Sequence, residues 1–305
     1  MGNTFTRRRH NPGRPPICRK APPPTYPSPY PYPPGNPYLE LDPILKWAAR
    51  STLPPIPEKP YTSIHTRNLA YHVYAHPDSD AWLLNLDQLK TRLDLFNGRR
   101  VIAIAEGDKL IPRADIEKIL GHDCEYYTFP NDPRLREVAS FSRLLWQVRS
   151  IDSNTATFYA HTKGTAPHHR DNVPKQLAIH QWRNRMYHEL LDHWPLVATA
   201  LKTNACVGTH KIDYSMMKDY IMHSPTGLEW GKWHFAGNFY WFRHDCIFRN
   251  PHWSEIPDDP FAAEMWLGKF IDSADAASLF QDWNPKTHPA PDLYNIGSHP
   301  PVRPH

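Results

Sequence analysis

Four residues that follow one apolar stretch carry the chemistry of an anion-binding site. The stretch 155–160 (TATFYA) is typical of a buried strand, and it is followed directly by His161, Lys163, Gly164 and Thr165. Lys163 is a point charge suited to a phosphate oxygen, and Gly164 lets the backbone turn sharply towards a ligand. His161 and Lys163 alternate, so on an extended chain they point the same way. The pattern predicts an anion or diphosphate site, with a solvated basic loop as the alternative.

A second candidate lies in the aromatic segment 234–241 (HFAGNFYW), which Gly237 and Asn238 interrupt. Glycine weakens a strand and often marks a bulge or a close approach to a ligand. An asparagine side chain can hydrogen-bond a hydroxyl group or a base edge. Neighbouring aromatic faces would then line a sugar site. The alternative is a bulged core strand whose rings only pack.

Three carboxylates complete the set of candidate residues. Glu264 lies among apolar residues in 261–268 (FAAEMWLG), so it is a candidate general base, or else a surface residue of an amphipathic helix. Asp78 and Asp80 form a DxD pair after the first predicted strand, and such a pair can hold a divalent cation that bridges two phosphates. Asp80 also precedes a predicted helix, so a helix cap is the alternative for this pair.

The composition narrows the class of protein. The chain has 305 residues, of which 40% are hydrophobic, and this is enough for a sizeable core. The net charge of +4 suits anionic ligands without requiring a nucleic acid, so we predict no specific nucleic-acid partner. The four cysteines lie far apart without a CxxC pair, which argues against a disulfide scaffold and predicts a cytoplasmic protein. No run reaches the ~18 consecutive apolar residues of a membrane span.

The elements that must position these residues alternate between strands and helices. Strands are predicted at 68–75, 100–105, 125–129, 155–160 and 205–209, helices at 82–96, 114–120, 133–148, 174–201 and 261–271, and an aromatic strand or strand pair at 232–244. This order predicts an α/β fold with a mainly parallel sheet flanked by helices. Ligands bind at the carboxyl ends of the strands in such sheets, which is where the segment after residue 160 lies.

Two segments lie outside the predicted globular domain of residues 61–281. About half of the 34 prolines fall before residue 61, so residues 1–60 are predicted to form a disordered, proline-rich leader. This leader is a flexible arm or a ligand for a protein partner of the SH3 or WW kind, because it contains several PxxP matches. Residues 282–305 are predicted to form an irregular tail.

Several ordered blocks together resemble a known family. The segments 158–164 (FYAHTKG), 234–245 (HFAGNFYWFRHD) and 263–268 (AEMWLG) are similar to the YxHxKG, SGNFWW and ExW pattern of bacterial and viral surface-polysaccharide glycosyltransferase-like proteins. The resemblance spans roughly residues 65–272. Ala236 and Tyr240 depart from the pattern, where serine and tryptophan are usual.

The resemblance implies a GT-A-like, Rossmann-like domain that moves a sugar from a nucleotide-sugar donor to a glycan hydroxyl. Lys163 and His161 would neutralise the diphosphate and Glu264 would act as the base. Substrate would be bound by a further set: Gly164, Thr165, Gly237, Asn238, Trp241 and Trp266.

The family pattern has no DxD at the strand where other GT-A enzymes carry one. Lys163 and His161 are therefore expected to do the work of a cation, and Mn²⁺ or Mg²⁺ on Asp78 and Asp80 is the alternative. Two other functions stay open: a non-catalytic glycan- or partner-binding module, and a histidine-rich phosphoryl-transfer or metal-hydrolase enzyme. The hydrolase is the weakest of the three, because the 19 histidines include no HExxH motif.

Overall fold

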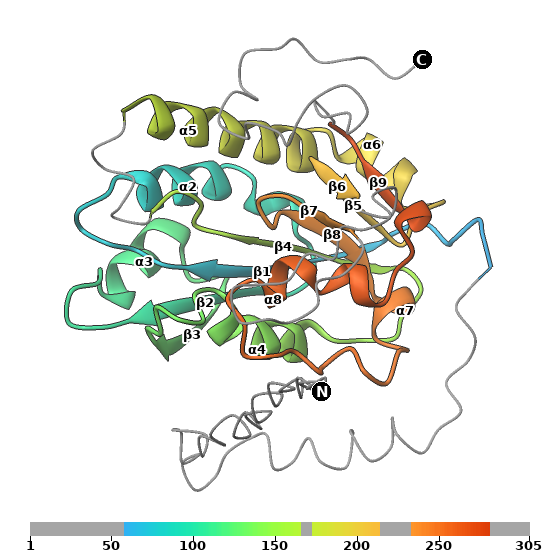
Figure 1. Ribbon diagram of the computed structural model, residues 1–305, viewed down its shortest axis with the longest axis horizontal. Helices are drawn as coiled ribbons and strands as arrows, with labels where there is room; N and C mark the ends of the chain where they lie inside the picture. Colours follow the sequence, from blue (N-terminus) through green and yellow to red (C-terminus); the bar gives the residue numbers. More distant parts are fainter. Residues whose placement is uncertain (1–57, 166–172, 214–232, 281–305) are drawn as a thin grey trace, which may run out of the picture. The chain divides into compact units, whose positions relative to one another are not determined.

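The computed structural model describes residues 58–165, 173–213 and 233–280 (Figure 1). The predicted tail, and the predicted leader as far as residue 57, lie outside these ranges. Within them, no helix combines the length and the apolar character needed to cross a membrane.

A seven-stranded sheet forms the centre of the fold, in the order β3-β2-β1-β4-β8-β5-β9. Its strands are β1 (Thr66–Val73), β2 (Arg100–Glu106), β3 (Glu125–Pro130), β4 (Thr155–His161), β5 (Cys206–Gly208), β8 (Tyr240–Arg243) and β9 (Ala276–Ser278). β8 runs antiparallel to both of its neighbours, and every other adjacent pair is parallel. The prediction of a mainly parallel sheet is therefore confirmed.

The aromatic segment predicted at 232–244 divides between two sheets. β7 (Trp233–Phe235) pairs antiparallel with β6 (Lys211–Asp213) in a separate two-stranded sheet, whereas β8 joins the central sheet. The turn between β7 and β8 contains Gly237 and Asn238. The interruption of the aromatic run is therefore a change of sheet and not a bulge within one strand.

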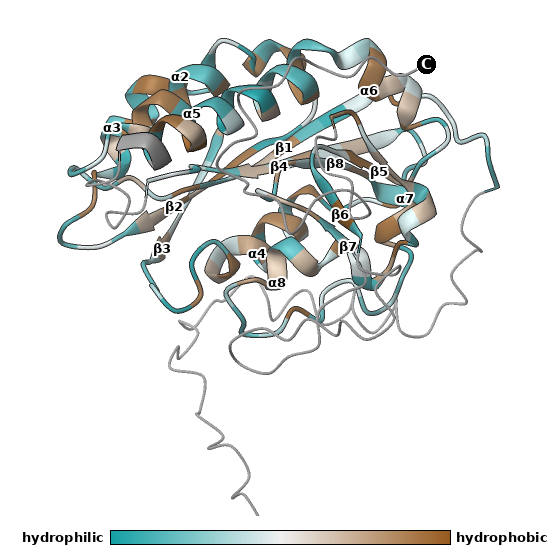
Figure 2. Ribbon diagram, turned by 45° about the horizontal axis from the view of Figure 1, so that its top comes forward, coloured by the Kyte–Doolittle hydropathy of each residue, from teal (hydrophilic) through white to brown (hydrophobic). Residues whose placement is uncertain are grey.

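Helices cover both faces of the sheet (Figure 2). Alternate residues of the strands explain this, because Leu69 and Tyr71 of β1 belong to one buried hydrophobic cluster and Ala70 belongs to another. The first cluster packs the sheet against α2 (Ala81–Lys90), α3 (Arg113–Leu120) and α5 (Val173–Tyr187). The second packs it against α4 (Val138–Val148) and α8 (Ala262–Met265). Such double coverage accounts for the continuous apolar run of β2.

Several elements differ in extent from the prediction. The predicted long helix is α5, a π-helical turn η3 (His188–Asp192), and α6 (Trp194–Ala200) with Pro195 in its first turn. The predicted helix 133–148 begins only at Val138. The remaining short helices are η1 (Leu93–Leu95), α7 (His244–Ile247), η4 (Leu267–Lys269) and η5 (Ser273–Asp275). The delayed start of α4 matters most, because it leaves residues 131–137 as a loop.

Candidate active site

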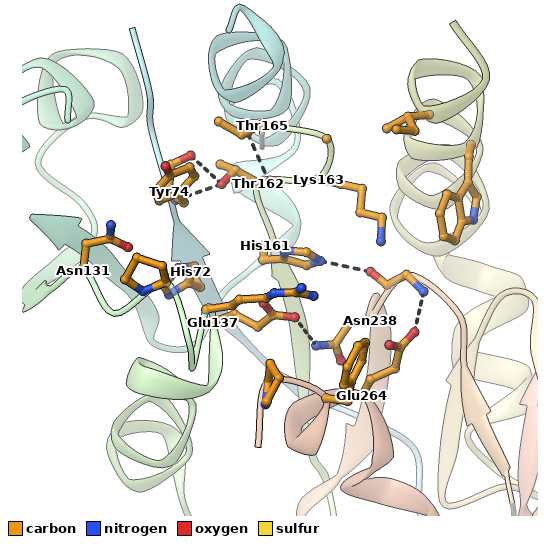
Figure 3. Close-up of a pocket in the computed structure, with 18 residues that line it drawn as sticks. His72, Tyr74, Asn131, Glu137, His161, Thr162, Lys163, Thr165, Asn238 and Glu264 are labelled. Carbon is orange, nitrogen blue, oxygen red and sulfur yellow. Dashed lines mark hydrogen bonds between the residues drawn. The ribbon is translucent and has the colours of Figure 1, made fainter. Parts of the chain in front are cut away.

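A pocket of about 520 Å³ lies at the carboxyl ends of β1 and β4 (Figure 3). β2 and β3 lie on one side of β1, and β4 lies on its other side. Strand order therefore reverses between β1 and β4, and this reversal is where open α/β sheets bind ligands. His72 and Tyr74 line the pocket from β1 and the residue after it, while His161 and Lys163 line it from the end of β4.

The segment after β4 has a fixed backbone. Thr162 Oγ1 accepts a hydrogen bond from the Tyr74 amide at 2.8 Å and donates one to the Tyr74 carbonyl at 2.9 Å. The buried Asn85 of α2 pairs with both backbone groups of Lys163, at 2.9 Å to the carbonyl and 3.2 Å from the amide. Gly164 follows with φ +85°, a left-handed conformation that favours glycine. The Lys163 side chain is thus presented from a rigid turn.

Gly237 and Asn238 form a tight turn on the opposite wall. Their φ angles are +92° and +62°. A Cβ atom on Gly237 would lie 2.8 Å from Met186 Sδ, so only glycine fits against α5. His161 Nε2 donates to the Gly237 carbonyl at 3.2 Å, and the Gly237 amide donates to Glu264 Oε1 at 3.1 Å. The turn therefore joins the end of β4 to α8.

Glu264 faces this turn from the single-turn helix α8, and its side chain is 23% exposed. His234 Nε2 lies 3.8 Å from Glu264 Oε1. Burial lowers the pKa of His234, and the carboxylate of Glu264 only partly opposes this effect. The position agrees with the prediction of a pocket carboxylate rather than with a surface residue.

Sequence reasoning missed a second carboxylate, Glu137, which lines the pocket at the end of the 131–137 loop. Burial would raise the pKa of Glu137, but its own backbone and the neighbouring His161, His72 and Lys163 favour the charged form, and the net shift is downward. Arg136, with φ +53°, also lines the pocket and stacks on Phe261 at 5.3 Å from the ring centroid. The predicted helix had placed both residues within its first turns.

Burial controls the charge of the basic side chains. It lowers the pKa of Lys163, against the attraction of Glu264 and Glu137. It also lowers the pKa of His161, which Glu137 raises only in part, and lowers that of His72 to about 4. The Lys163 ammonium lies 4.4 Å from the centroid of the Trp182 ring, a cation–π contact. In this structure His161 holds the Gly237 turn through its hydrogen bond to the Gly237 carbonyl.

Two predicted substrate-binding residues lie elsewhere. Trp241 is fully buried in the core between the sheet and α5, where its Nε1 donates to the Leu190 carbonyl at 2.9 Å. Trp266 is buried on the other face, where it donates to the Trp253 carbonyl at 2.7 Å. Neither ring lines the pocket, so the prediction that they shape it is wrong. Both indole N–H groups are already satisfied by backbone oxygens, as expected of core tryptophans. The predicted binding residues Gly164, Thr165, Gly237 and Asn238 do line it.

The predicted metal pair lies outside this pocket. Asp78 and Asp80 are exposed and do not line it. Asp80 stands at the start of α2 but makes no capping hydrogen bond through its side chain. Among the described residues, one group of potential metal ligands comes close enough together, and it consists of His188, Glu189 and His193 on and just after η3. That group also lies outside the pocket lining.

Searches against protein-family models and against curated proteins find no match for this chain.

Proposed function

We propose that this protein is a glycosyltransferase that moves a sugar from a nucleotide-sugar donor to a hydroxyl group of a glycan. One observation carries the proposal. A partly buried lysine and a partly buried carboxylate, Lys163 and Glu264, line one pocket at the point where strand order reverses. The proposed fold is a GT-A-like nucleotide-sugar domain, and the mainly parallel sheet with helices on both faces supports it.

The leaving diphosphate would be stabilised by Lys163, with Arg136 nearby. Burial disfavours the ammonium form of Lys163. A diphosphate would favour the charged form, because an anion nearby stabilises an ammonium group. The rigid turn made by Asn85 and Gly164 places this charge without a cost of reorganisation at the moment of reaction.

The acceptor hydroxyl would lose its proton to Glu264. One oxygen of its carboxylate, Oε1, accepts the hydrogen bond of the Gly237 amide, which fixes the orientation of the side chain. A positioned base of this kind contributes about 10²–10⁴-fold to a reaction rate. The alternative, a glycan- or partner-binding module without transferase activity, needs neither a diphosphate site nor a base.

A thermal-shift screen tests the proposal. The probes are UDP, GDP, CDP and dTDP and their sugars, each with Mn²⁺ and with EDTA. A ligand at 100 times its Kd adds about 2.7 kcal/mol of stability, a shift of several degrees. We expect one nucleotide family to stabilise the protein and to keep doing so in EDTA, because the pocket supplies its own cations.

Transfer with the nucleotide sugar so identified is then measured for Glu264→Gln. We expect turnover to fall by at least 10²-fold with little change in the affinity for the nucleoside diphosphate. The control is Glu117→Gln on α3, a partly exposed residue outside the pocket lining that pairs with Arg113. No stabilisation by any nucleotide, with binding to a glycan array, would favour the binding module.

A further inference from the structure

The side-chain nitrogen of Asn238 has a hydrogen-bond partner among the described residues, and its side-chain oxygen has none. Its side chain lines the pocket although the residue is only 2% exposed. Nδ2 donates to Glu137 Oε1 at 3.4 Å, and Oδ1 is buried without a hydrogen-bond partner in the described part of the chain (Figure 3). A buried acceptor without a partner costs roughly 1–3 kcal/mol, so such groups call for a partner that binds later.

The orientation of this amide follows from its neighbour. A charged carboxylate accepts hydrogen bonds and donates none. If the amide were turned over, its oxygen would face the Glu137 oxygens and both would lack a donor. Nδ2 must therefore face Glu137, and Oδ1 is the atom of this pocket-lining residue that lacks a partner among the described residues. The 3.4 Å separation is long for an N–H···O bond, so Glu137 retains acceptor capacity as well.

The left-handed backbone of Asn238 is a second observation in favour of a ligand-binding role for this turn. A left-handed conformation costs an L-residue about 1–2 kcal/mol, less for asparagine. Gly237 permits this turn, and hydrogen bonds from His161 and to Glu264 hold it. The turn therefore fixes the position of the free oxygen.

We propose that Glu137 and Asn238 form a subsite that receives hydrogen-bond donors of the ligand, and that these donors are the hydroxyl groups of a sugar. The inference deepens the proposed function and rests on it. Both groups present oxygen acceptors, so a phosphate oxygen would find no donor there. An ammonium group of a ligand would compete with Lys163 for the carboxylates of Glu137 and Glu264, and Arg136 lines the same pocket. A neutral hydroxyl meets both conditions.

With this subsite, the pocket has two regions that would bind different parts of the ligand. Lys163 and Arg136 would take the diphosphate, and the Glu137–Asn238 pair would hold the sugar beside it. Removing the pair should therefore weaken the binding of the sugar and leave the binding of the bare diphosphate in place.

The test measures two affinities by calorimetry, for a nucleoside diphosphate and for the matching nucleotide sugar, in the intact chain. The variants are Asn238→Gly, which accepts the left-handed backbone, and Glu137→Gln, which keeps the shape. The control is Asn184→Ala, because Asn184 also has a buried oxygen without a described partner but lies outside the pocket lining. Thermal unfolding of each variant verifies that it folds.

We expect the preference for the sugar nucleotide over the diphosphate to fall about tenfold or more in Asn238→Gly and in Glu137→Gln, and to stay unchanged in Asn184→Ala. Diphosphate binding with an unchanged preference in both pocket variants would overturn this inference and leave the transferase proposal standing.

If the native protein binds no nucleotide but binds free glycans on an array, and Asn238→Gly abolishes that binding, the transferase proposal fails and the subsite is supported. If the native protein binds neither class of probe, both proposals are overturned.

Discussion

Charged or polar groups are buried near both ends of β8, but they differ in whether they have hydrogen-bond partners. At the C-terminal end of β8, Arg243 and Asp245 are fully buried and form an ion pair through two contacts of 3.1 and 3.2 Å. Arg243 Nη1 also donates to the carbonyls of Thr62 and Leu201, at 2.9 and 3.0 Å. Before its start, Asn238 leaves an oxygen without a partner among the described residues.

The comparison separates two uses of a buried polar group. The Arg243 guanidinium is satisfied from three sides, which is the condition for a buried charge to hold a fold together. Asn238 and Lys163 instead line the pocket. Groups of the first kind should affect stability when changed, and groups of the second kind should affect binding.

The largest expected effect on stability is that of Arg243→Met. It leaves the Asp245 carboxylate buried and uncompensated, so the free energy of unfolding should fall by about 3–5 kcal/mol. Urea unfolding measures this. The double variant Arg243→Met/Asp245→Leu serves as a control, because it removes both charges and should recover part of the loss. A loss below about 1 kcal/mol in the single variant would break the comparison.

Lys163→Met should affect binding and not stability, the opposite of Arg243→Met. The affinity for the nucleoside diphosphate or the rate of transfer should fall about 10²–10³-fold, while stability stays the same or rises because burial disfavours the ammonium that is removed. Affinity in the native protein should also decrease with rising pH, since only protonated Lys163 attracts the anion. Lys118→Met, at an exposed position of α3, is the matched control. Equal loss of stability and binding would assign Lys163 a structural role.

The stability of the protein should decrease in acid because of His72, which lines the pocket. Its pKa is lowered from 6.5 to about 4 by burial, so the unfolded chain binds this proton more tightly than the folded one. Stability should therefore decrease as the pH falls from about 6.5 towards 4, by about 3 kcal/mol at pH 4 from this group. His72→Gln keeps a partner for Ser140 Oγ, which lies 2.6 Å from His72 Nδ1, and should flatten that part of the profile. Thermal unfolding between pH 4 and 8 measures both chains, and parallel profiles would contradict the prediction.

The smallest expected effect is the change in stability of Asn238→Gly. Glycine tolerates the φ of +62°, and the lost side chain had one long hydrogen bond, so the free energy of unfolding should change by no more than about 1 kcal/mol. Asn238→Ala should lower the free energy of unfolding by roughly 1 kcal/mol more than Asn238→Gly, because alanine is strained in the left-handed conformation. A loss comparable with that of Arg243→Met would erase the difference between the two ends of β8.

The sequence by itself determined the class of fold and the location of the site. Alternating apolar runs and amphipathic segments require a sheet covered on both faces, and the order of elements requires mainly parallel pairing. The segment His161 to Thr165 then had to lie at a carboxyl edge of the sheet. Gly237, Asn238 and Glu264 were also named from sequence, because a glycine in an aromatic run and a carboxylate among apolar residues are locally unusual.

Only the tertiary structure decided which polar groups face the pocket and which are satisfied in the core. Glu137 looked like part of a helix until α4 was found to begin at Val138, which leaves the carboxylate on a loop against His161. Trp241 and Trp266 looked like sugar platforms, yet backbone carbonyls distant in sequence bind their N–H groups. Local pattern records the type of a side chain, whereas its partners come from long-range packing, and those partners determine whether it holds the fold or awaits a ligand.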